Sequence, residues 1–298
     1  VDANALGEGP QQQEAVVKQL QQKIGQLPVW NALLSDQTDF DWLLTPEKSK
    51  SGIYRTPDGK GIVIANEMVS RTFRVFPNLA TVDYTNRMLG ESLLRAVSNE
   101  GYIWIDGKKW SIGGLAGQPE RGYLKNEWLD DLHTIPESFL VEDFEIKPIE
   151  ETIRWARSRW ALNKEMPTGQ ELVFTLRGDK ELSSVTLKLH FSIYDHIPVI
   201  RKWFEVENGS SLPINVDHFK LEYLAFAEPE SPSDGDPSKF LLPNIHIESD
   251  YNCKGTLRNG IQILPKNGWK IRNILHNGII RWKLLVSWTY LHKSDRIN

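Results

Sequence analysis

The chain has 298 residues, 40% of them hydrophobic, which is enough to bury a large core. Its formal net charge of −4 gives no support for a nucleic-acid partner, because such partners favour a basic face. No apolar run approaches the roughly 20 residues that span a bilayer, so we also expect no membrane partner.

The chain contains a single cysteine, Cys253, which excludes an internal disulfide and leaves the redox compartment open. It begins at Val1 rather than at a methionine, as it would after removal of an export signal or after trimming. Both explanations stay open, and the location that we expect is secreted or periplasmic in a bacterium.

The first segment, residues 1–45, is predicted to contain one helix. Apolar residues recur there at spacings of three and four and form one stripe: Val16, Val17, Leu20, Ile24 and Leu27. Pro28 then ends the helix. We expect the helix to dock on the body of the protein, and a partner-binding helix is the alternative.

Beyond residue 45 the hydrophobic pattern changes to period two, which predicts strands. The clearest signal is YIWIDGKKWSIGG, residues 102–114, in which two β-rich arms flank Asp106-Gly107. This dipeptide is favoured in tight type I′ turns. Residues 113–139 are predicted to be a long surface excursion with one short helical turn near Asn126–Leu132.

Strands are predicted again from residue 153 onward. Residues 153–163 and 171–178 each form one strand, and residues 185–194 alternate without a break between apolar and polar side chains. One side of this last strand is therefore expected to be dry and the other wet.

The stretch YDHIPVIRKWFEVENGSSLPINVD, residues 194–217, is predicted to be a hairpin. It turns at Asn208-Gly209, because Asn and Gly tolerate positive φ. The charged residues on its first arm are interpreted as the wet face of a sheet whose other face is buried: Arg201, Lys202, Glu205 and Glu207. Arg201 and Glu205 are expected to share one face with Trp203.

The predicted fold class is mostly β, a large two-sheet antiparallel β-sandwich with a short N-terminal helix. The chain lacks the βαβ alternation of a parallel barrel. We divide it into an N-terminal helical extension (1–45), a β-sandwich (46–250) and a divergent C-terminal segment (251–298). The last segment is either foreign to the fold or forms its last strands.

No catalytic constellation is visible in the residues themselves. GGLAGQ, residues 113–118, lacks the spacing of a phosphate loop, and the histidines form no HExxH pattern. No GxSxG elbow is present, and the carboxylate pairs Asp130/Asp131 and Glu150/Glu151 are interpreted as solvated loops. We therefore predict no catalytic residue, no metal site and no cofactor.

The order of five segments carries a family resemblance: LATVDYTN, ESLLRAVSNEGYIWIDGKKWSIGG, GQPERGYLKNEWL, MPTGQELVFTL and YDHIPVIRKWFEVENGSSLPINVDHFKLEYLA. Over about residues 55–250 the chain resembles the N-terminal domain of α-galactosidase-like glycoside hydrolases of the family 36 clan. The last block is the most specific of the five.

This resemblance implies a β-supersandwich of the galactose-mutarotase type. In that family the domain precedes a (β/α)8 barrel, and the barrel carries the catalytic aspartates. The motif positions that hold those aspartates do not exist in this sequence, so no catalytic residue is carried over.

The sequence after Asp250 departs from the family pattern. It is rich in Lys, Arg, Asn, Ile and Trp, and Asp295 is its only acidic residue. One hypothesis is a truncated or frame-shifted gene; the alternative is a divergent last pair of strands with arms around Asn277-Gly278. Reading the downstream DNA in the other frames would distinguish them, since only the first hypothesis requires barrel-like coding sequence there.

The leading functional expectation is a non-catalytic, carbohydrate-associated domain that binds sugar weakly or through a catalytic partner domain. Flat aromatic rings suit the apolar face of a pyranose, so the candidate sugar-stacking residues are Trp104, Trp110, Trp128 and Trp203. Trp155 and Trp160 are further aromatic residues of interest.

Two alternatives belong to other classes. A stand-alone mutarotase- or epimerase-like enzyme needs a general acid and base, which would come from His190, His196 or His218 with Glu205 or Glu222. A structural interaction module would use the N-terminal helix for docking, with self-association as a further option.

Overall fold

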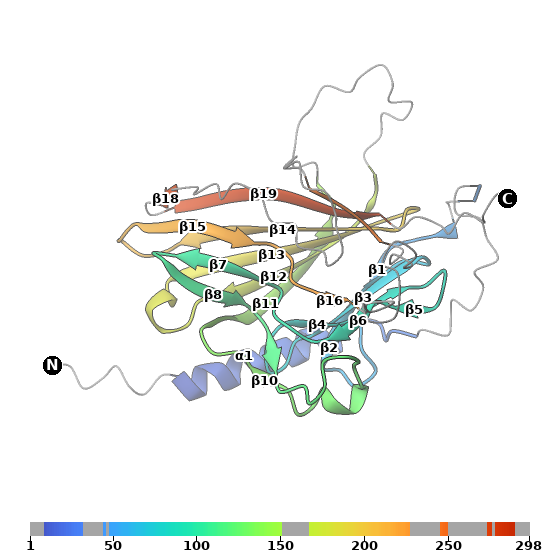
Figure 1. The fold of residues 1–298 in the computed structure, drawn as a ribbon, viewed down its shortest axis with the longest axis horizontal. Coiled ribbons are helices and arrows are strands. Elements are labelled where there is room, and N and C mark those ends of the chain that lie inside the picture. The colour runs from blue at the N-terminus through green and yellow to red at the C-terminus, as the bar shows by residue number, and fades with distance from the viewer. Residues whose placement is uncertain are drawn as a thin grey trace, which may run out of the picture.

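The computed structural model describes residues 9–31, 44–45, 48–150, 167–226, 245–249, 273–275 and 278–289. These residues form mostly β-strands in a sandwich-like arrangement, with one α-helix, α1 (Gly9–Gly25), near the N-terminus (Figure 1). The predicted fold class is confirmed. None of the helices among these residues is both long and apolar enough to cross a membrane.

The smaller of the two main sheets has five strands in sequential, antiparallel order. They are β1 (Gly52–Arg55), β2 (Gly61–Ala65), β3 (Val69–Arg74), β4 (Ala80–Asn86) and β5 (Glu91–Ser92). Two short pairs lie beside the main sheets: β9 (Leu115–Ala116) with β10 (His133–Thr134), and β6 (Leu94–Ala96) with β16 (Ala225–Phe226). Two 3-10 turns lie in connections between strands: η3 (Asn126–Trp128) between β9 and β10, and η4 (Lys180–Leu182) further along the chain.

The larger sheet has ten strands. In spatial order they are β17 (His246–Ser249), β19 (Gly278–Thr289), β14 (Val199–Asn208), β13 (Val185–Tyr194), β12 (Gly169–Arg177), β11 (Ser138–Pro148), β8 (Lys108–Ile112), β7 (Gly101–Ile105), β15 (Ile214–Lys220) and β18 (Asn273–Leu275). Its β11–β8 junction is parallel and only two residue pairs long, Ser138 with Ser111 and Phe139 with Ile112.

This short junction divides the larger sheet into a long section, β17 to β11, and a short section, β8 to β18 (Figure 1). The two sections pack their inner faces against each other. Phe204 of β14 and Phe219 of β15, for example, meet edge to face with ring centroids 4.9 Å apart. The inner faces of the smaller sheet and of both sections contribute to one core.

The core also joins the smaller sheet to the long section directly. Phe73 of β3 lies 5.4 Å from Phe174 of β12 and 4.5 Å from Phe191 of β13, measured between ring centroids. Helix α1 packs on the same core through Leu20 and Ile24, which are completely buried. The predicted docking of the helix stripe on the body of the protein is confirmed.

Several local predictions are also confirmed. Asp106 and Gly107 join β7 to β8 with φ angles of 51° and 80°, the positive values that a type I′ turn requires. The apolar side of β13 is fully buried, as its alternation indicates. A helical turn occurs at Asn126–Trp128 within the surface excursion.

The predicted hairpin at residues 194–217 is wrong. β14 pairs with β13 and β19, whereas β15 pairs with β7 and β18, so the two arms belong to opposite sections of the larger sheet. Asn208 instead builds an Asx turn: its Oδ1 accepts hydrogen bonds from the backbone N–H and the hydroxyl of Ser210. Neither Asn208 nor Gly209 has a positive φ.

Two strands come from the segment predicted to diverge. β19 pairs along all of β14, from Val199 opposite Thr289 to Asn208 opposite Gly278, while β18 pairs with β15. The two arms around residue 277 are therefore strands with different partners. The frame-shift hypothesis stays a prediction. Cys253, Trp155, Trp160 and the predicted strand at residues 153–163 lie outside the described residues.

Candidate functional site

The four tryptophans predicted to stack on sugar lie in two kinds of environment. Trp110 and Trp203 are only 2% and 3% exposed, so neither ring offers a face to a ligand, and their burial removes them from the set of candidates. Trp104 and Trp128 are partly exposed. Trp128 lies 5.3 Å from Tyr123 between ring centroids, with Lys125 over both rings.

Trp104 belongs to a larger aromatic surface on the outer side of the short section. It consists of Tyr102, Trp104, His218 and Tyr223, and we call it the aromatic face. Tyr102 and Trp104 alternate with buried Ile103 and Ile105 along β7, which directs both rings outward.

The neighbouring strand completes the aromatic face. His218 of β15 is the cross-strand partner of Trp104, and the two rings stack with centroids 3.9 Å apart and planes at 22°. Tyr102 lies 6.0 Å from Trp104 and 5.2 Å from Tyr223, which is 43% exposed. The four rings form a nearly continuous apolar surface with polar edges.

Cationic groups border this surface. Lys109 Nζ lies 3.6 Å from the Tyr102 ring centroid and 5.6 Å from that of Trp104, and Lys220 is the cross-strand partner of Tyr102. Burial and the neighbouring Tyr223 raise the pKa of Tyr102, so its phenol stays a neutral hydrogen-bond donor. The border can therefore donate hydrogen bonds to hydroxyl or anionic oxygens.

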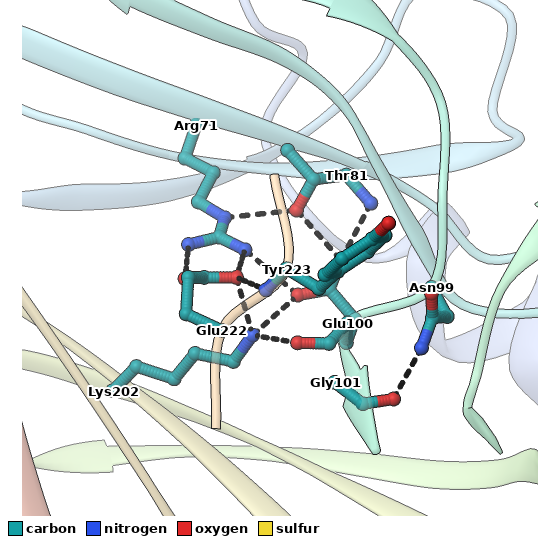
Figure 2. A network of polar contacts seen from close by, with 8 residues as sticks. All are labelled: Arg71, Thr81, Asn99, Glu100, Gly101, Lys202, Glu222 and Tyr223. Atoms are coloured by element: carbon teal, nitrogen blue, oxygen red, sulfur yellow. Dashed lines mark hydrogen bonds and ion pairs between the residues drawn. The ribbon is translucent and has the colours of Figure 1, made fainter. Parts of the chain in front are cut away.

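A buried charge network lies at one end of the aromatic face and consists of Arg71, Glu100, Lys202 and Glu222 (Figure 2). Arg71 binds Glu100 and Glu222 at 2.7 Å each, and Lys202 Nζ binds the same two carboxylates at 2.8 Å each. The side chains of Arg71 and Lys202 are fully buried, and that of Glu222 is 11% exposed. Tyr223 follows Glu222 and donates its backbone N–H to the Glu222 carboxylate at 3.3 Å.

Lys202 corrects one interpretation of the sequence. Arg201 and Glu205 do share the outer face of β14 with Trp203, but Lys202 projects from the core face together with Ile200 and Phe204. A lysine is tolerated there because two carboxylates and the backbone carbonyl of Glu100 accept all three of its N–H groups.

The charges of this network balance, two cations against two carboxylates. Burial alone would raise the pKa of Glu100, but Lys202 and Arg71 lower it to about 2. Burial alone would lower the pKa of Arg71, and Glu222 and Glu100 raise it instead. Each carboxylate binds both cations, so the network has a structural role and holds the base of Tyr223 in place.

The histidines of the enzyme alternative are distributed over three places. His190 Nδ1 contacts Glu171 at 3.0 Å, His196 Nε2 contacts Lys50 at 3.2 Å, and His218 lies on the aromatic face. Glu222 belongs to the buried charge network. The structure thus gives His190 a partner that the sequence did not indicate, because Glu171 lies on a different strand, 19 residues away.

The Glu171–His190 pair is buried on the outer side of the long section. Ser192 donates to the second oxygen of Glu171 at 2.8 Å, and the His190 ring stacks on Trp203 with centroids 3.5 Å apart. Burial would raise the pKa of Glu171, but His190, Ser192 and Lys147 lower it to about 2. Within the described part of the chain, His190 Nε2 has no hydrogen-bond partner.

A groove of about 620 Å³ crosses the outer face of the smaller sheet. Its main charged groups are paired with one another: Arg74 binds Asp58 at 2.7 Å and also contacts Asp130, which binds Lys60 at 2.8 Å. Little hydrogen-bonding capacity is therefore left for a ligand. Among the described residues, no group of three or more His, Cys, Asp or Glu side chains could hold a metal ion.

Comparison with models of known protein families gives no match for this chain, and comparison with curated proteins gives none either. Among the described residues, the aromatic face and the groups around it are the features that favour a ligand.

Proposed function

We propose that this protein binds carbohydrate on its aromatic face, as a non-catalytic domain associated with glycoside hydrolysis. The observation that carries the proposal is the partly exposed Trp104–His218 stack, extended by Tyr102 and Tyr223. The four rings lie on neighbouring strands and at the end of β15, so the surface exists before any ligand binds.

The chemistry of this surface supports the proposal. Exposed aromatic rings that pack against one another lose little side-chain freedom on binding, and they cover the apolar side of a pyranose. The two phenol hydroxyls, the imidazole and the two neighbouring lysines can form hydrogen bonds with the hydroxyl groups of the sugar. The resemblance to α-galactosidase-like enzymes supports galactosides as the first ligands to test, and a secreted or periplasmic location suits extracellular glycans.

Trp104→Ala is expected to weaken galactoside binding at least tenfold, because it removes the largest ring of the face and the stacking partner of His218. Isothermal titration with melibiose and with a galactan oligosaccharide measures the effect. Trp128→Ala is the matched control, since this tryptophan is also partly exposed but lies next to Tyr123 instead. Unchanged binding by the Trp104 variant, or no binding of any sugar by the wild type, would contradict the proposal.

A second candidate is a stand-alone mutarotase- or epimerase-like enzyme, and the Glu171–His190 pair is the observation that favours it. A carboxylate that binds one ring nitrogen orients the imidazole. Because Nε2 is buried, proton transfer to a sugar there requires a local opening of the structure.

For this candidate, His190→Gln is expected to abolish any acceleration of the anomerisation of galactose, which polarimetry measures. Gln keeps a hydrogen bond to Glu171 but cannot take up a proton at neutral pH. Wild-type protein that leaves the uncatalysed rate unchanged would rule out this candidate for galactose.

A further inference from the structure

We propose a second binding site, a pocket between Trp30, Tyr54 and Arg87 that binds the carboxylate and ring of a single acidic sugar, a hexuronate. The pocket lies at the β1 edge of the smaller sheet, and none of its lining residues belongs to the aromatic face. The inference goes beyond the proposed function and does not depend on it.

The backbone that follows α1 builds one wall of this pocket. Arg55 of β1 donates its N–H to Pro28 at 2.9 Å, and Trp30 donates its N–H to Arg55 at 2.8 Å. The chain therefore runs beside the edge strand, with an isolated parallel bridge between Val29 and Arg55. This places the Trp30 ring 5.0 Å from that of Tyr54, centroid to centroid.

Arg87 lies over the Trp30 ring and differs from three other arginines of the fold in its partners. Its guanidinium carbon lies 4.7 Å from the Trp30 ring centroid, and its buried Nε has no hydrogen-bond partner among the residues that the structure describes. Arg71, Arg74 and Arg177 each bind at least one carboxylate at 2.7 Å or closer. Arg87 makes no such ion pair with the described residues, although burying a guanidinium without an acceptor is unfavourable.

The guanidinium lies over the indole ring, and its planar fork of N–H groups can bind a carboxylate with two parallel hydrogen bonds. Burial lowers the pKa of Arg87 and Glu67 opposes that effect, so the group stays charged at neutral pH. An anionic ligand is therefore the best hydrogen-bond acceptor for the Arg87 guanidinium.

The other lining groups narrow the class of anion. Trp30 and Tyr54 line the pocket with aromatic rings, which favour an anion attached to a ring over a free inorganic ion. Glu67 also lines the pocket, and its carboxylate oxygens are hydrogen-bond acceptors that favour hydroxyl groups on the ligand. Lys50 also lines it and already contacts Asp195 and His196, at 3.7 and 3.2 Å. The pocket of about 110 Å³ is smaller than a whole hexuronate, so it would receive the carboxylate and the adjoining edge of the ring.

The test is isothermal titration of the intact protein with glucuronate and galacturonate, with glucose, galactose and acetate as comparison ligands. We expect the uronates to bind at least tenfold more tightly than the neutral sugars and than acetate. Neutral sugars that bind as tightly as uronates would overturn the role of Arg87. If acetate bound as tightly as the uronates, the proposed role of the Trp30 and Tyr54 rings would be wrong.

Arg87→Met is expected to reduce uronate affinity at least tenfold and to leave galactoside binding unchanged. The matched control is Arg177→Met, which removes an arginine that pairs with Glu142 on β11. Thermal unfolding shows that the variants fold, and Arg87→Met is expected to melt no lower than the wild type because Arg87 has no acceptor to lose. Equal uronate affinity of wild type and Arg87→Met, or no uronate binding by the wild type, would overturn the proposal.

Discussion

Glu100→Gln is expected to lower the free energy of unfolding by about 3–5 kcal/mol, because it breaks a buried ion pair and leaves charge uncompensated. Glu100 binds Arg71 and Lys202 through one carboxylate oxygen and the backbone N–H and hydroxyl of Thr81 through the other. Gln keeps the shape but removes the negative charge. Two buried cations would then share Glu222 alone.

Urea unfolding followed by far-UV circular dichroism measures this loss. Glu181→Gln is the control, because Glu181 also pairs with a lysine, Lys108, but on the exposed surface. We expect the control to leave the urea midpoint unchanged. A loss below about 1 kcal/mol for Glu100→Gln would show that water or a local rearrangement compensates the two cations.

A double variant separates charge balance from the loss of individual hydrogen bonds. Lys202→Met combined with Glu100→Gln leaves Arg71 paired with Glu222, one cation with one anion. We expect the combined loss to be smaller than the sum of the two single losses, by about 1–3 kcal/mol. Additive losses would mean that the groups act independently.

The same carboxylate gives stability a defined pH dependence. Lys202 and Arg71 hold the pKa of Glu100 at about 2 in the folded state, below its ordinary 4.5, so the unfolded chain binds this proton more readily. The contribution is fully present above about pH 4.5 and is lost as the pH falls toward 2. Glu100→Gln is therefore expected to flatten the decline of stability in this window.

Strand alternation in the sequence predicts side-chain direction well but not partners. Ile200, Lys202 and Phe204 share one phase of β14, so Lys202 could have been assigned to the core from the pattern alone. Its partner Glu100 is 102 residues away, on the approach to β7. Only the packing of the smaller sheet and the short section on β14 brings these groups together.

The same distinction separates the four predicted tryptophans. Trp104 alternates with Ile103 and Ile105 and lies outside, whereas Trp110 is in phase with Ile112 and lies inside. Composition alone does not distinguish the exposed tryptophans from the buried ones. The histidine that stacks on Trp104 comes from β15, a pairing that no local pattern contains.

Turn chemistry misled the prediction at residues 208–213 for a related reason. Asn208 does build a turn, but a turn specifies the local path of the chain and not the strands that will pair. Here the next strand crosses to the other section of the larger sheet, where β7 offers it a free edge. The pocket at Trp30 could not be predicted either, because its three main residues come from separate parts of the chain: the segment after α1, strand β1 and the turn after β4.

Phe73→Ala is expected to lower the free energy of unfolding by about 3–5 kcal/mol, the usual cost of removing a buried aromatic ring. Phe73 of the smaller sheet packs between Phe174 and Phe191 of the long section and is completely buried. Its ring also lies 5.2 Å from the guanidinium carbon of Arg71. The substitution therefore leaves a cavity at the contact between the two sheets.

Because the cavity lies between the two sheets, the variant tests whether they unfold as one unit. Because they share a core, tryptophan fluorescence and circular dichroism are expected to report the same urea midpoint in the wild type and in Phe73→Ala, shifted together in the variant. Tyr123→Ala, which removes an aromatic ring that is 51% exposed, is the control and is expected to change stability by about 0.5 kcal/mol or less. Two separate transitions in Phe73→Ala would show that the smaller sheet is stable by itself, and that the buried charge network links two independent units.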